Sequence, residues 1–211
     1  MSRSDVVRDY GGVSAETRRA DRRSKLLAAG RQVWGESGVA EVSVRGVCAA
    51  SGLTPRYFYE HFPNREALIG EVALEVRAQV TELLVATSLV TPGGLEPKLR
   101  AALTAFFELL TRDRHVHRMV SDVATAGSLV QYRIEMHDLI TELVLHYGSD
   151  LIDADLSDPA EVRRSALFVV GGVNMVLEDW LREPTQSAAE LAAACTRLCL
   201  AAIGAGGPSV A

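Results

Sequence analysis

Helical periodicity runs through almost all of this 211-residue chain, and it limits the possible folds more than any other feature. Apolar residues recur three or four positions apart, as in Leu68, Val72, Val76 and Val80, which places them on one face of a helix. No stretch of useful length alternates apolar and polar residues with the period of two that a half-buried strand requires. We therefore predict an all-α fold.

Capping and stop signals divide the chain into about nine helices. Ser43, Thr54 and Asn64 are expected N-caps, Ser187 and Glu190 form a capping box, and glycines 38 and 52 end the helices before them. Pro55 starts a short helix, because the missing N–H of proline costs least at the first helical position. The other predicted helices cover about residues 18–37, 44–51, 64–88, 96–111, 115–125, 128–152, 160–182 and 187–203.

The longest uncharged apolar stretch, residues 165–177, is shorter than the roughly 20 residues that a membrane span needs. The N-terminus also lacks the apolar core of a signal peptide. We expect a cytoplasmic protein with no membrane partner. Cys48, Cys195 and Cys199 have neither the paired count nor the spacing of a disulfide framework or zinc site, so we expect them in the core.

Charge is divided unevenly along the chain, although the total is −5. Residues 1–65 contain 11 Lys and Arg against 7 Asp and Glu, whereas residues 66–211 contain 11 against 20. A basic end on an acidic remainder indicates that only the N-terminal part meets phosphate. The alternative is that the arginines near residue 20 form an ordinary solvated helix face.

The segment GLTPRYFYEHF, residues 52–62, contains four of the chain's aromatic residues. At 100° per residue, Phe58 and Phe62 share one face of the short helix, while Tyr57 and Tyr59 point elsewhere. Such a short helix cannot be stable alone, so we expect the two phenylalanines to pack against the first helix. The outer face would then be free to contact a partner.

The stretch SVRGVCAASGLTPRYFYEHFPNREAL, residues 43–68, resembles the helix-turn-helix of the tetracycline-repressor-like (TetR) family of transcriptional regulators. Chain length, the first helix and the capped last helix agree with the resemblance, whereas residues 96–160 match only in helical content. It implies a homodimeric repressor that binds a palindromic operator in double-stranded DNA and is released by a small hydrophobic ligand. No enzymatic activity and no cofactor are implied.

Carried over by position, the resemblance assigns DNA contacts to nine residues. Phosphate contacts are expected from Ser43, Thr54, Tyr59, His61 and Arg65, base-edge contacts from Arg45, Arg56 and Tyr57, and Pro55 lies among them. The first turn of a recognition helix is also the part that reaches base edges in the major groove, which independently favours Thr54, Arg56 and Tyr57. Glu60 on the same outer face would repel phosphate.

We divide the chain into a disordered basic arm (1–17), a helix-turn-helix DNA-binding domain (18–65), a helical ligand-binding and dimerisation domain (66–204) and a disordered tail (205–211). The arm could enter the minor groove. Gly171 and Gly172 lie in an apolar helix, where each costs roughly 1 kcal/mol relative to alanine. Close approach of a second subunit would offset that cost, although the same apolar stripe would also serve an intrachain core.

Soft or amphipathic residues on the middle helices are candidates for a mostly apolar ligand pocket. They are Phe106, Phe107, Met119, Tyr132, Met136, His137, Asn174 and Met175. Each is also compatible with a plain core. No metal site is predicted, because His115 and His117 diverge by about 200° on a helix.

Two other classes of function remain open at this stage. One is an all-helical enzyme with His137 or His146 as a general base, although no nucleophile motif or phosphate loop supports it. The other is a helical interaction module without DNA binding, for which Glu60 is the main argument.

Overall fold

The computed structural model describes residues 14–147, 158–183 and 185–203, and all of its regular elements are helical. The prediction of an all-α fold is therefore confirmed. The helices are α1 (Ala15–Ser37), α2 (Val44–Ser51), α3 (Pro55–Tyr59), α4 (Arg65–Val90), α5 (Leu95–Arg112), α6 (Arg114–Thr125), α7 (Val130–Tyr147), α8 (Pro159–Arg182) and α9 (Ala188–Ala202), with short 3-10 turns at Val39–Glu41 and Gly127–Leu129.

Side-chain caps start three of these helices where the sequence predicts. Ser43 accepts a hydrogen bond from the Gly46 N–H, Asn64 accepts one from Ala67, and Ser187 with Glu190 forms the expected capping box. Gly52 ends α2 in the left-handed region at φ 68°, which a residue with a Cβ rarely adopts.

Some predicted helix boundaries differ from the structure. Ser14 caps α1 through the Thr17 N–H, so α1 begins within the stretch assigned to the basic arm; the rest of the arm, the tail and residues 148–152 lie outside the described residues. Thr54 is the N-cap of α3, but its side chain makes no capping hydrogen bond. Pro55, with its preset backbone angle, starts that helix instead.

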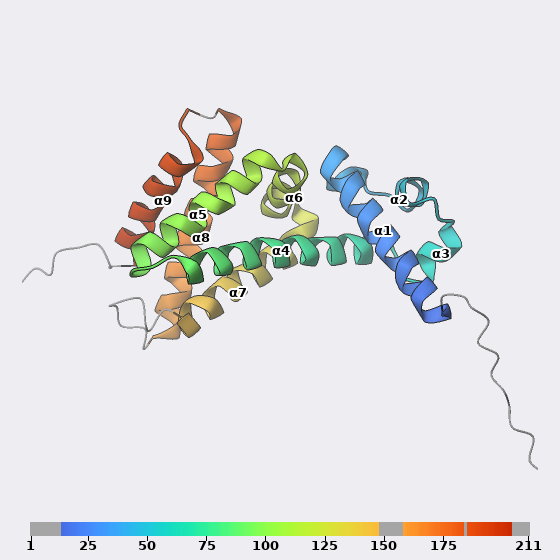
Figure 1. Cartoon of the computed structure of the whole chain (residues 1–211), viewed down its shortest axis with the longest axis horizontal. Helices are drawn as coiled ribbons and strands as arrows, with labels where there is room; N and C mark the ends of the chain where they lie inside the picture. The colour runs from blue at the N-terminus through green and yellow to red at the C-terminus, as the bar shows by residue number, and fades with distance from the viewer. Residues whose placement is uncertain (1–13, 148–157, 184, 204–211) are drawn as a thin grey trace, which may run out of the picture.

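The helices form two parts joined by α4, which runs from one to the other (Figure 1). We call α1, α2 and α3 the head, and α5 to α9 the body. The N-terminal half of α4 packs against α1, and most of its length lies beside α5 and α7 in the body. A shift of α4 relative to the body would therefore also move the head.

A filled apolar core holds the head together. The fully buried side chains include Trp34 and Leu26 of α1, Phe58 of α3 and Leu68 of α4, together with Phe62 in the turn between α3 and α4. The rings of Phe58 and Phe62 are 5.7 Å apart, within the range of favourable aromatic pairs. The predicted burial of both phenylalanines is confirmed, and it anchors a helix of only five residues.

Helix α6 provides a second connection between head and body, which the sequence analysis missed. One carboxylate oxygen of Asp122, Oδ2, accepts hydrogen bonds from the Trp34 indole N–H at 2.7 Å and from the Val39 backbone N–H at 2.8 Å. A charge-assisted bond to a part-buried indole is stronger than a neutral one. The head is thus attached to the body at α6 as well as through α4.

Three further observations bear on the sequence analysis. Cys48, Cys195 and Cys199 are free and buried, as predicted, and burial raises the pKa of the Cys199 thiol to about 11. Among the described residues, no helix is long and apolar enough to cross a membrane. The described part of the chain also contains no group of three His, Cys, Asp or Glu residues arranged to hold a metal ion.

Candidate nucleic-acid interface and ligand cavity

Seven of the nine predicted DNA-contact residues are exposed, and they belong to α2, to α3 or to the N-caps of these two helices. They are Ser43, Arg45, Thr54, Pro55, Arg56, Tyr57 and Tyr59. The side chain of Arg56 is 86% exposed, and Tyr59 is exposed while its neighbour Phe58 is fully buried. The alternation follows from the helical rotation of α3, so the buried phenylalanine fixes the direction of the exposed residues.

Two arginines neutralise Glu60, the acidic residue on this surface. Arg56 Nε lies 3.4 Å from one carboxylate oxygen of Glu60, and Arg22 Nη2 of α1 lies 4.0 Å from the other. The Arg22 guanidinium also lies over the ring of Tyr57, 4.8 Å from its centroid. These contacts remove the main argument against phosphate binding and hold Tyr57 in a cation–π contact.

His61 and Arg65 differ from the other seven because both are half-buried. His61 Nε2 is buried with no hydrogen-bond partner in the described structure, and burial with nearby Arg19 and Arg22 lowers the His61 pKa. Arg65 Nε lies 3.1 Å from a Glu66 carboxylate oxygen. A neutral imidazole is a weaker phosphate ligand than a guanidinium, so Arg65 is the better candidate of the two.

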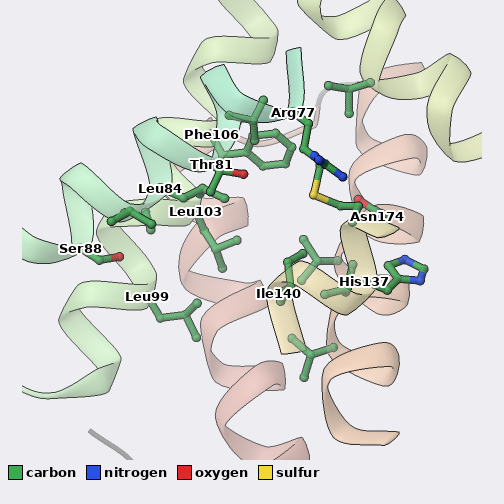
Figure 2. A pocket seen from close by; sticks show the side chains of 18 of the residues that line it. Arg77, Thr81, Leu84, Ser88, Leu99, Leu103, Phe106, His137, Ile140 and Asn174 are labelled. Carbon is green, nitrogen blue, oxygen red and sulfur yellow. The ribbon is translucent and has the colours of Figure 1, made fainter. Parts of the chain in front are cut away.

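A cavity of about 430 Å³ lies in the body, lined mainly by apolar side chains from α4 to α9. That volume is within the range typical of pockets for small organic ligands. Five predicted residues line it: Phe106, Tyr132, Met136, His137 and Asn174. Figure 2 shows His137 and Asn174 at one end of the cavity and Ser88 and Leu99 at the other.

Three other predicted pocket residues do not line the cavity. Phe107 is fully buried and packs against Trp180, with ring centroids 6.4 Å apart, and Met119 is buried in the core. Met175 is 65% exposed on the outer face of α8. Neighbours in sequence point about 100° apart on a helix, so residue type alone could not separate Phe106 from Phe107 or Asn174 from Met175.

The polar residues that α4 and α5 contribute to the cavity were not predicted. Arg77, Thr81 and Ser88 follow one another on the side of α4 that faces the cavity, and Lys98 lies on α5. Their spacing of four and seven residues places the three α4 side chains on one face, which was the available sequence signal.

An apolar face of α8 is exposed in this single chain. Phe168 is 73% exposed, and Leu167 and Met175 are also exposed. Gly171 and Gly172 lie between Phe168 and Met175 in the sequence, and a Cβ added at either glycine would meet no atom of the described residues within 4 Å. These two glycines therefore do not pack against the described part of the same subunit, although other apolar residues of α8, such as Leu177 and Trp180, do belong to its core.

The head has the architecture of a helix-turn-helix DNA-binding domain, attached to a helical body with a cavity. The family described as "Bacterial regulatory proteins, tetR family" matches residues 26–72, which run from α1 into α4. Residues 26–72 therefore carry the helix-turn-helix region of the TetR family of transcriptional regulators. That class consists of DNA-binding proteins rather than enzymes.

Comparison with individual proteins agrees with this assignment. An uncharacterized HTH-type transcriptional regulator of Haemophilus influenzae is 28% identical over 110 residues, 52% of this chain and 53% of that protein. The matched part therefore spans about half the length of that curated relative. The HTH-type transcriptional regulator AcrR of Shigella flexneri is 24% identical over 174 residues, 77% of this chain and 79% of AcrR.

The fold also matches a solved repressor structure. SmeT, the repressor of the Stenotrophomonas maltophilia multidrug efflux pump SmeDEF, superposes with a TM-score of 0.65 at 21% identity, covering 89% of this chain and 94% of SmeT. At that identity the likeness establishes the fold alone.

Proposed function

We propose that this protein is a transcriptional repressor that binds a palindromic operator in double-stranded DNA as a homodimer and is released by a small apolar ligand. The observation that carries the proposal is the exposure of arginine, hydroxyl and aromatic side chains on α2, α3 and their N-caps, while Phe58 and Phe62 of the same segment are buried. The acidic residue of that segment, Glu60, is paired with arginines.

Each exposed residue has a part in this proposal. Arg45 and Arg56 carry planar guanidiniums that can bind a guanine in a bidentate manner, worth about 1–3 kcal/mol of discrimination each. Tyr57 lies beside Arg56 in the first turn of the recognition helix. Ser43, Thr54, Pro55 and Tyr59 surround these groups and would position the protein on the backbone, and Arg65 would add a charged phosphate contact.

Residues 18–65 would form the DNA-binding domain and residues 66–204 the ligand-binding and dimerisation domain. The exposed apolar face of α8 supports the dimer, because a second copy would cover Phe168 and Met175 and approach closely at the two glycines. Two heads on a rigid dimer bind well only when their recognition helices are about 34–36 Å apart, one turn of DNA.

Ligand response would follow from the two connections between head and body. A ligand beside α4 that prefers the spacing unable to bind DNA would tilt α4 and strain the contact of Asp122 with Trp34. A 100-fold preference of the ligand for that state is worth about 2.7 kcal/mol. By reciprocity, operator DNA would weaken ligand binding by the same factor.

Selection of bound duplexes from a random DNA library, followed by filter binding, tests the DNA-binding proposal. We expect a palindromic site for which R56A and Y57A lose discrimination against random DNA, while helical content and dimerisation stay intact. R65A should weaken binding to all sequences and reduce the salt slope by about one unit. R100A, which removes an exposed arginine on α5, is the matched control and should bind like the wild type.

Unchanged discrimination in both R56A and Y57A would show that α3 is not the recognition helix. Failure to enrich any sequence would instead favour the helical interaction module.

A further inference from the structure

We infer that the cavity in the body binds an amphipathic monoanion, such as a medium-chain carboxylate, with its anionic group on Arg133 and its apolar part between α4, α5 and α7. The inference rests on the proposed function, since it names the class of ligand for the same cavity. It starts from the charges of the lining.

The lining is cationic. Its charged side chains are Arg77, Lys98 and Arg133, and none of the described residues that line the cavity is Asp or Glu. His137 also lines it, and burial followed by the nearby Arg133 lowers the His137 pKa, so the imidazole is neutral near pH 7. A cationic ligand would therefore meet like charges and no carboxylate.

The three cations differ in what neutralises them. Arg77 Nη1 lies 3.5 Å from a Glu135 carboxylate oxygen, an ion pair that offsets its charge. Lys98 Nζ instead donates to the Ser88 carbonyl at 3.1 Å, near the end of α4. In the described part of the chain neither Lys98 nor Arg133 makes an ion pair with a carboxylate, so two formal positive charges remain.

Arg133 is the better anion site because other polar groups lie beside it. Its Nη1 donates to the Ala124 carbonyl at 2.7 Å and weakly to that of Val123, at the end of α6. These bonds fix the guanidinium while leaving the Nη2 and Nε donors for a ligand. His137 follows one turn later on α7, and the amide of Asn174 lies near His137 at the same end of the cavity (Figure 2).

The rest of the cavity suits an apolar chain. Leu84, Leu103, Phe106 and Ile140 line the space between the end with His137 and the end with Ser88 (Figure 2). A flexible alkyl chain would remove these side chains from water without requiring further polar partners. The anionic group and the alkyl chain of the ligand would thus lie against different kinds of side chain. This difference favours an amphipathic molecule.

Isothermal titration of the full-length protein with three ten-carbon probes, each below its micelle concentration, tests the inference. The probes are decanoate, 1-decanol and decyltrimethylammonium, which share the alkyl chain and differ in charge. We expect decanoate to bind about tenfold or more tightly than decanol, the ratio for one charge-assisted hydrogen bond, and the ammonium compound to bind most weakly. Comparable or tighter binding of decanol or the ammonium compound, or no binding of any probe, would overturn the inference.

Variants locate the anionic group. R133Q should lose most of the preference for decanoate over decanol, and R133K, which keeps the charge, should retain part of it. K98Q removes the charge at the other end of the cavity and should keep the preference. A preference lost in K98Q but kept in R133Q would refute the assignment to Arg133. Should R133Q not fold, the ranking of the three probes on the wild type still decides the ligand class.

Filter binding to the selected operator separates this inference from the proposed function. If decanoate binds with the expected ranking but leaves the operator complex intact, the ligand class stands and the proposed release fails. If a neutral or cationic compound binds in the cavity and releases the operator, the release stands and the ligand class is wrong.

Discussion

The head and the body are both built from amphipathic helices, yet they differ in packing: fully buried side chains make up the core of the head, whereas a cavity lies beside the core of the body. In the head, Phe58 is fully buried and belongs to the same core cluster as Leu26 and Trp34. In the body, Phe106 is also nearly buried, but it borders a cavity of about 430 Å³. Phenylalanine is thus part of the packed core in the head, whereas in the body it lines the cavity.

This difference in packing suits the two parts to different functions. A filled core holds side chains in fixed rotamers, which a surface that must match the spacing of base edges requires. A hollow core lacks part of its packing contacts, so a molecule that fills it can change how its helices lie. The difference in packing density would thus keep the exposed side chains of the head in fixed positions and allow the helices of the body to shift when a ligand binds.

A matched pair of phenylalanine substitutions gives the largest expected effect. F58A should lower the free energy of unfolding by about 3–5 kcal/mol, because it removes a fully buried ring and leaves a cavity in its place. F106A should cost at least about 1 kcal/mol less, because it only enlarges an existing cavity. Urea unfolding followed by circular dichroism measures both. Equal losses would show that the cavity is packed as tightly as the head.

Removal of the Asp122 carboxylate tests the connection between the two parts. D122A leaves the Trp34 indole N–H and the Val39 N–H without their acceptor, and an unsatisfied buried donor costs about 1–3 kcal/mol. We expect a loss of about 2 kcal/mol in urea unfolding.

D122N is the control, because one amide oxygen can still accept from both donors. It should cost less than D122A. If both variants unfold like the wild type, the α1–α6 contact contributes nothing to joining head and body.

Substitutions at Gly172 test whether the exposed part of the body is an interface. G172A should raise the stability of the isolated subunit by about 1 kcal/mol, since alanine favours helix and no described atom of the same subunit opposes its Cβ, and it should weaken the dimer less than G172L does. G172L should give monomers in sedimentation, because its longer side chain would separate the facing helices. Dimers of G172L would place the interface elsewhere.

The smallest expected effect is a dependence of stability on pH that involves both parts. Burial lowers the pKa of His61 in the head and of His137 in the body. The unfolded chain therefore binds more protons, so stability should be complete above about pH 6.5, the ordinary histidine pKa, and fall below it.

Glutamine variants test whether these two histidines cause the pH dependence of stability. Urea midpoints at pH 7.5 and 5.5 should differ less for H61Q and for H137Q than for the wild type, because glutamine binds no proton in this range. Curves that stay parallel to the wild type would exclude both histidines.

Local sequence signals were enough to predict the fold class, several helix starts and the buried face of α3. Periodicity predicted an all-α chain, caps such as Asn64 and Ser187 marked where helices begin, and the face shared by Phe58 and Phe62 predicted which aromatics of α3 are buried. These features depend on residues within a turn or two of one another, and the backbone geometry of a helix converts such spacing directly into position.

Contacts between helices that are distant in sequence could not be predicted and are visible only in the tertiary structure. Asp122 meets Trp34 across 88 positions, Arg77 meets Glu135 across 58, and Phe106 rather than Phe107 faces the cavity. Each depends on how helices rotate and cross when they pack, which is set by the sum of many weak contacts. The sequence of one helix shows which of its faces is apolar but not which helix covers that face. The cavity and the α1–α6 contact therefore exist only in the assembled fold.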